Sequence, residues 1–154
     1  MDVSAQSQLL DASSGLHRGS ARDSTPIVHR LTGREASAIV NDAGAGCFGY
    51  GDLAVTRHAG DVTGDFDGVF VYLRDMDDNR FWSASFQPTA AEPQHYRADF
   101  SPGRAAYHRE DGGIHLETEV CICPETDAGL WRCNISNRSG RPRTIELTSY
   151  LEWV

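Results

Sequence analysis

The sequence contains no lysine, and all 14 of its basic residues are arginine. Two interpretations stay open: the codon bias of a GC-rich genome, or the use of arginine's planar fork for bidentate contacts to anions and sugar hydroxyls. The 22 acidic residues give the chain a formal net charge of -8. This charge argues against nucleic acid as a partner, because such binding depends on clustered cations. It also opposes contact with anionic membrane surfaces.

Long apolar runs are missing as well. No stretch approaches the roughly 18 consecutive apolar residues of a membrane-spanning helix, so we expect no membrane insertion by this chain. The N-terminus has neither the basic start nor the continuous apolar core of a secretory signal, and we predict a cytoplasmic protein. Four cysteines in a chain of 154 residues do not indicate a disulfide framework.

The usual motifs of catalytic and metal sites are not found. Cys121 and Cys123 have a C-x-C spacing, which differs from the C-x₂₋₄-C knuckle of a zinc site. The 6 histidines show no ligand-type spacing, and no G-x-S-x-G sequence is present. We therefore predict no metal ligand, no cofactor and no catalytic residue in this chain. Whether the chain belongs to an enzyme stays open.

Glycine is concentrated in one stretch, residues 41–57, which read NDAGAGCFGYGDLAVTR. GAGCFG at 44–49 has the letters of the dinucleotide-binding G-x-G-x-x-G motif. That motif requires a strand before it and a helix after it, and the residues that follow have the pattern of a strand or turn. We interpret the stretch as a tight connection into a strand, where glycine tolerates a positive φ and a close backbone approach.

The composition divides the chain near residue 25. Residues 1–25 are rich in Ser, Ala, Gly, Asp and Gln, and they hold few large apolar side chains. Such a segment gains too little from burial to offset the entropy lost on ordering, so we predict a flexible leader. Residues 26–154 are predicted to form one domain.

Within that domain the hydrophobic period is two, which is typical of strands. In residues 113–123 one face of the strand would carry Ile114, Leu116, Thr118, Val120 and Ile122. The turn 110–113 predicts a hairpin between 105–109 and 114–120. Further strands are expected in the ranges 68–75, 80–86, 130–137 and 143–154. Strands at this spacing without amphipathic helices indicate an all-β fold, an antiparallel β-sandwich.

A set of aromatic and polar residues, most of them between positions 48 and 96, is a candidate for a ligand site. Sugar sites combine aromatic faces with a few oriented polar groups. The alternative is that the aromatic rings fill the sandwich core. The set comprises Phe48, Tyr50, Tyr72, Trp82, Phe86, Tyr96 and Trp131, with Asp52, Arg57, Arg74 and Gln87.

Four strings, at 41–57, 68–75, 81–89 and 141–152, together resemble the N-terminal β-sandwich of the glycoside phosphorylases and cyclic β-1,2-glucan synthases. This family was formerly called glycosyltransferase family 36, and the likeness runs from about Leu31 to Val154. The resemblance implies a sandwich of the galactose-mutarotase-like kind (a supersandwich), associated with carbohydrate binding. In the family, this domain precedes an (α/α)₆ barrel with the catalytic Asp. This chain would contain only part of the sandwich and none of the barrel.

The resemblance also implies a set of sugar-side residues. Asp52, Arg57, Arg74, Trp82 and Gln87 match the family strings, and we add Tyr50 beside them as a predicted carbohydrate contact. Cys47 and Gly49 depart from the family pattern.

Three functions stay open at this point. The first is an accessory β-sandwich that binds a β-glucan or oligosaccharide. The second is a catalytic protein in which carboxylates such as Asp52 act on sugar, or a fragment of an active inverting phosphorylase. The third is a structural domain whose exposed strands, such as 143–154, pair in a homodimer. A separate catalytic barrel is a further expected partner.

Overall fold

The computed structural model describes residues 17–19, 25–59 and 66–154, and every element in these ranges is a β-strand. The largest sheet has five strands in the order β1-β8-β9-β10-β11, and all neighbours in it are antiparallel. Its strands are β1 (His17–Gly19), β8 (His95–Ser101), β9 (Arg104–Asp111), β10 (Ile114–Ile122) and β11 (Gly129–Asn137). No helix in the described part of the chain is long and apolar enough to cross a lipid bilayer.

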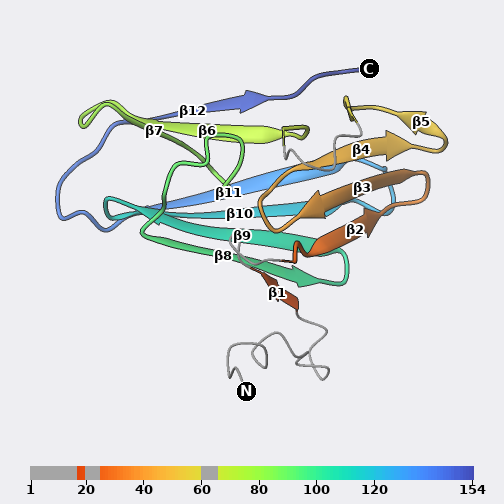
Figure 1. Ribbon diagram of the computed structural model, residues 1–154, viewed down its shortest axis with the longest axis horizontal. Coiled ribbons are helices and arrows are strands. Elements are labelled where there is room, and N and C mark those ends of the chain that lie inside the picture. The colour runs from red at the N-terminus through yellow and green to blue at the C-terminus, as the bar shows by residue number, and fades with distance from the viewer. Residues whose placement is uncertain (1–16, 20–24, 60–65) are drawn as a thin grey trace.

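Two smaller antiparallel sheets lie against this large sheet. The four-stranded sheet has the order β2-β3-β4-β5, and the three-stranded sheet has the order β12-β6-β7. Figure 1 shows β6, β7 and β12 running above β9, β10 and β11. The strands are β2 (Val28–Thr32), β3 (Ala36–Asn41), β4 (Gly46–Tyr50), β5 (Leu53–Ala54), β6 (Phe70–Asp75), β7 (Arg80–Ser83) and β12 (Ile145–Tyr150).

The core consists of two clusters between these layers. In one, Leu31 and Ala38 of the four-stranded sheet pack with Phe100 and Val120 of the large sheet, among others. In the other, buried residues of the three-stranded sheet pack with Ile114 and Leu116 of β10. Each large apolar side chain buried in this way contributes roughly 1.5–3 kcal/mol to stability. The predicted antiparallel β-sandwich is confirmed.

The alternation predicted for residues 113–123 is present in β10. Every second residue from Ile114 to Ile122 is buried, and the residues between them are half-buried. The predicted hairpin with β9 is also confirmed, and its turn contains Gly112 and Gly113 at positive φ values of 57° and 79°. The period-two pattern therefore predicted both the strand and its inward face.

Two expectations differ in detail from the structure. The predicted strand 80–86 ends at Ser83, and the predicted strand 143–154 is shorter, at Ile145–Tyr150. Within the predicted leader, His17–Gly19 form β1, which pairs with β8; residues 1–16 and 20–24 of it lie outside the described residues. Short edge pairings such as β1 depend on a distant partner, so local composition does not reveal them.

The first part of the glycine-rich stretch, residues 42–45, forms the β3–β4 connection. The Asn41 side-chain oxygen accepts hydrogen bonds from the backbone N–H groups of Ala43 (3.1 Å) and Ala45 (2.9 Å). Gly44 has a φ of 89°, and a Cβ at this position would collide with Ser85. Strand β4 follows directly, not a helix. The dinucleotide-binding alternative is therefore excluded by the fold, and the stretch is the tight connection that we predicted.

Candidate ligand-binding face

The structure does not bring the six predicted carbohydrate residues into one cluster. Tyr50 and Asp52 are exposed at the β4–β5 turn, on the four-stranded sheet. Trp82 is only 3% exposed and packs in the core beside Leu73. Its ring therefore presents no face to solvent in this structure.

Gln87 lies in the loop after β7, where its backbone holds the loop in place. Its N–H donates to the carbonyl oxygen of Ala43 (2.9 Å), and its carbonyl oxygen accepts from the Ser85 hydroxyl (2.9 Å). Arg109 supports the same loop, because its guanidinium donates to the Ser85 carbonyl oxygen at 2.7 Å. The loop is thus fixed between the β3–β4 connection and the large sheet.

Three aromatic rings, Tyr72, Phe81 and Tyr150, form a continuous strip on the outer face of the three-stranded sheet; we call it the aromatic strip. Tyr72 and Phe81 stack with ring centroids 5.4 Å apart and planes 16° apart. Tyr150 meets Tyr72 edge-on at 6.5 Å. The strand register explains the contact between Tyr72 and Phe81. Phe81 of β7 lies directly opposite Arg74 of β6, so Tyr72, two residues before Arg74, is the diagonal neighbour of Phe81. Phe81 is 55% exposed and Tyr150 is 44% exposed, so the strip offers apolar surface to a ligand.

A hollow of about 460 Å³ opens beside the Tyr72–Phe81 stack. This volume lies within the range of about 300–1,000 Å³ that is usual for ligand sites. The Arg74 guanidinium on its border donates to the Asn79 side-chain oxygen at 3.0 Å. The residues around the hollow are Tyr72, Leu73, Arg74, Asn79, Phe81, Glu146 and Thr148.

A second, smaller hollow of about 240 Å³ lies at the other end of the strip, and Arg57, Tyr150 and Glu152 border it. The Arg57 guanidinium donates to Glu152 at 2.8 Å, and the Tyr150 hydroxyl donates to the other oxygen of Glu152 at 2.5 Å. These two hydrogen bonds lower the pKa of the Glu152 carboxyl. The same contacts raise the pKa of both Arg57 and Tyr150. At neutral pH the hollow therefore contains a carboxylate, a guanidinium and a neutral phenol.

The structure thus places two predicted residues, Arg57 and Arg74, at opposite ends of the aromatic strip. Tyr150 connects the two hollows, because it borders the one at Arg57 and contacts Tyr72 in the other. Sequence reasoning did not select Phe81, Tyr150 or Glu152 as site residues. Residues two apart in a strand share a face, so the expected strand 143–154 offered a signal that Thr148, Tyr150 and Glu152 lie together.

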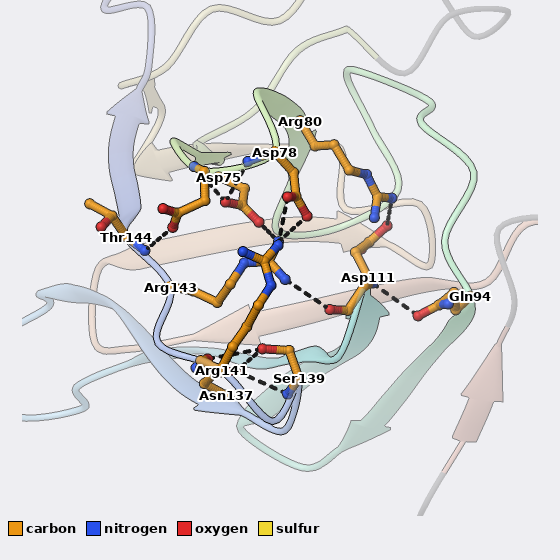
Figure 2. A network of polar contacts seen from close by, with 12 residues as sticks. Asp75, Asp78, Arg80, Gln94, Asp111, Asn137, Ser139, Arg141, Arg143 and Thr144 are labelled. Atoms are coloured by element: carbon orange, nitrogen blue, oxygen red, sulfur yellow. Dashed lines mark hydrogen bonds and ion pairs between the residues drawn. The ribbon is translucent and has the colours of Figure 1, made fainter.

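A network of charged side chains fixes β12, which contributes Tyr150 to the strip. Figure 2 shows Arg143, just before β12, with its guanidinium directed at Asp75 and Asp78 of the β6–β7 hairpin. Asp75 is completely buried, and the backbone N–H of Thr144 also donates to Asp77 at 2.7 Å. These contacts hold β12 in register beside β6. The position of Tyr150 over Tyr72 follows from that register.

Chemically, the face combines apolar rings with polar groups that could contact a polyhydroxylated ligand. Flat aromatic faces can lie against the C–H surface of a sugar ring, while the guanidinium and carboxylate groups at the borders can bond its hydroxyls. Among the described residues, no group of three or more His, Cys, Asp or Glu side chains is placed to hold a metal ion.

The fold and this face together define the class of protein: an all-β sandwich in which two small sheets cover one large sheet. The chain belongs to the family described as "Glycosyl hydrolase 94, supersandwich domain", whose family model matches residues 17–154. The family resemblance found in the sequence is therefore confirmed.

Several curated proteins are similar to this chain. The cyclic beta-(1,2)-glucan synthase NdvB of Rhizobium meliloti (strain 1021) is 31% identical over 124 residues, which are 80% of this chain and 4% of the synthase. The N,N'-diacetylchitobiose phosphorylase of Vibrio furnissii is 32% identical over 101 residues, 64% of this chain and 13% of that enzyme. The cellobionic acid phosphorylase of Neurospora crassa is 34% identical over 85 residues, 54% of this chain and 10% of that enzyme. The chain thus spans only a small part of each relative.

Proposed function

We propose that this supersandwich domain is an accessory domain that binds a β-glucan or a related oligosaccharide, while any catalysis on that sugar takes place in another domain. The observation that carries the proposal is the exposed aromatic strip between two polar hollows. The names of the relatives agree with it, since they denote a glucan synthase and phosphorylases of sugar derivatives.

The size of the face fits a short stretch of sugar chain. A ligand over Phe81 and Tyr72 would bury apolar surface at both rings, and burial of one such side chain is worth roughly 1.5–3 kcal/mol. Arg74 and Glu146 line the hollow beside these rings, where they can bond ligand hydroxyls. Binding by a few such contacts is expected to be weak, because association costs the ligand its translational and rotational freedom.

Calorimetric titration with β-1,2-gluco-oligosaccharides tests the proposal. We expect binding to the unaltered chain, and a loss of about tenfold or more in affinity for Phe81→Ala, because each tenfold corresponds to about 1.4 kcal/mol. Val28→Ala is the control, since Val28 is 63% exposed on β2 of the four-stranded sheet and borders neither hollow of the strip. No heat at millimolar sugar would overturn the proposal. A loss with Tyr50→Ala but not with Phe81→Ala would move the site to the β4–β5 turn.

The third function from the sequence, strand pairing with a second copy of the chain, is supported by a separate observation. Within the described residues, β11 and β12 each pair on one side only, so both are edge strands. Leu130 and Ile135 of β11 and Leu147 of β12 are exposed by 51%, 37% and 44%. Exposed apolar edge strands favour association with further strands. Sedimentation equilibrium would show a dimer at tens of micromolar chain if a second copy is the partner, and a monomer would exclude it.

A further inference from the structure

The outer face of the large sheet contains a hollow that the proposed function does not use. Its volume is about 530 Å³, and it spans β8, β9, β10 and β11. Because the two small sheets cover the inner face of the large sheet, this hollow lies on the opposite side of the sandwich from the aromatic strip. This hollow and the one beside the Tyr72–Phe81 stack share no lining residue.

The side chains of the hollow stand in two rows that the strand register sets. In the first row His95, Glu110, His115 and Ser136 are direct neighbours across four strands. In the second row the order is Arg97, His108, Glu117 and Asn134. Neighbouring strands lie about 4.8 Å apart, so each row extends over about 14 Å. The polar groups are thus fixed by a rigid sheet.

Both carboxylates of the hollow already have cationic or potentially cationic partners. Glu110 lies 3.2 Å from the His115 imidazole, and Glu117 lies 3.2 Å from the Arg104 guanidinium. Their negative charge is therefore partly balanced within the sheet. The groups of the hollow that remain available to a ligand are its hydrogen-bond donors.

Three of these donors, Asn134, Ser136 and Arg138, lie on β11 or just after it. The backbone N–H of Arg138 donates to the Gly113 carbonyl oxygen at 2.7 Å, which fixes the start of its side chain at the border of the hollow. In the described part of the chain no carboxylate forms an ion pair with the Arg138 guanidinium. An arginine fork binds a carboxylate or phosphate through two parallel hydrogen bonds, and nearby amide and hydroxyl groups bond sugar hydroxyls.

We propose that this hollow is a second ligand site, which takes a sugar bearing an oxyanion, either the carboxylate of a uronic acid or the phosphate of a sugar phosphate. Arg138 holds the oxyanion, and Ser136 and Asn134 bond the neighbouring hydroxyls. The site is separate from the aromatic strip and goes beyond the accessory function proposed above.

Titration of the chain with D-glucuronate, D-glucose 6-phosphate and neutral D-glucose, followed by two-dimensional NMR, tests this site. We expect at least one anionic sugar to bind about tenfold or more tightly than glucose, with shifts at 134–138 and 108–117. Arg138→Gln should remove that preference. Arg132→Gln is the matched control on β11, because the Arg132 side chain is 73% exposed and pairs with Glu119. Glucuronate and glucose 6-phosphate distinguish the two possible oxyanions.

Three results would overturn the site: equal binding of glucose and the anionic sugars, equal losses in Arg138→Gln and Arg132→Gln, or binding of inorganic phosphate as tight as that of glucose 6-phosphate. None of them bears on the strip, because the gluco-oligosaccharides used there are neutral and their binding is read at Phe81. The two proposals therefore fail separately.

Discussion

The guanidinium of Arg143 reaches two aspartates of one hairpin: it forms an ion pair with the buried Asp75 and a 2.7 Å contact with Asp78 at the surface. Arg143 is itself 4% exposed at its side chain. Since Asp75 is wholly buried, the pair secures the start of β12 to the end of β6 in a place without solvent.

Arg143→Met should therefore destabilise the fold strongly. Removing one partner of a buried pair leaves an uncompensated charge, and this typically costs about 3–5 kcal/mol of unfolding free energy. Arg141→Met is the control, because Arg141 contacts the same Asp78 at 2.6 Å but is half exposed (50%), and such surface pairs contribute about 0–1 kcal/mol. Urea unfolding of both variants measures the difference. Similar losses in the two variants would contradict a special role for Asp75.

The hydrogen bonds accepted by Asp127 predict that the protein loses stability in acid. One oxygen of Asp127 accepts hydrogen bonds from the backbone N–H groups of Arg34, Glu35 and Ala36, at 2.7, 3.0 and 3.1 Å. The bond from Ala36 is the main cause that lowers the pKa of this carboxyl below its ordinary value of 3.8, followed by those from Glu35 and Arg34.

Because the pKa of Asp127 is lower in the folded state, the unfolded state binds its proton first as pH falls. The stabilisation is thus complete above the ordinary pKa of 3.8 and is lost as pH falls from there through the folded pKa. Asp127→Asn should remove this part of the pH dependence, which urea unfolding between pH 7 and pH 3 measures. An unchanged slope in Asp127→Asn would show that other carboxylates are responsible.

Gly44 and Gly103 form a matched pair for testing the glycine-rich connection. Both have a positive φ, at 89° and 74°, but an added Cβ meets Ser85 at Gly44 and nothing within 4 Å at Gly103. Gly103→Ala should lose about 1–2 kcal/mol, the usual penalty of an L-residue in the left-handed region. Gly44→Ala should lose clearly more, because the collision with Ser85 adds to it. Thermal or urea unfolding compares them, and equal losses would mean that the loop around Ser85 yields freely.

Trp82 should behave as a core residue. Trp82→Ala is expected to lower stability by about 3–5 kcal/mol, as for other large buried aromatic residues. Its neighbour on β7, Phe81, is 55% exposed, so Phe81→Ala should lose only about 0.5–1.5 kcal/mol through its stack with Tyr72. Urea unfolding distinguishes the two. A small loss for Trp82→Ala would contradict the packing of this ring against Leu73.

The family strings in the sequence predicted Trp82, Arg57 and Arg74 as sugar-side residues, but they did not indicate the strand face on which each side chain lies. Trp82 and Phe81 are adjacent in β7, and adjacent residues of a strand point to opposite faces. Which face is inward depends on the sheet that covers it. The sequence 80–86 has no clear alternation to decide this, and the structure places Trp82 inward and Phe81 outward.

The strand that pairs with β12 could not be predicted from the sequence, for a related reason. β12 follows β11 after a short connection, which would allow a hairpin, yet it pairs with β6. The Arg143 contact with Asp75, two residues 68 positions apart in the chain, joins the start of β12 to the end of β6. Contacts between residues so far apart in the chain produce no periodic pattern in a single sequence.

The sequence by itself determined the all-β class, the β9–β10 hairpin and the inward face of β10, because alternation and turn residues act over a few neighbouring positions. The four sequence strings were also sufficient to identify the family. Only the tertiary structure decided that Tyr72, Phe81 and Tyr150 form one face with Arg57 and Arg74 at its ends. The physical reason is that a sheet joins strands by packing and hydrogen bonds across the whole chain, so side chains from β6, β7 and β12 meet only after the layers have formed.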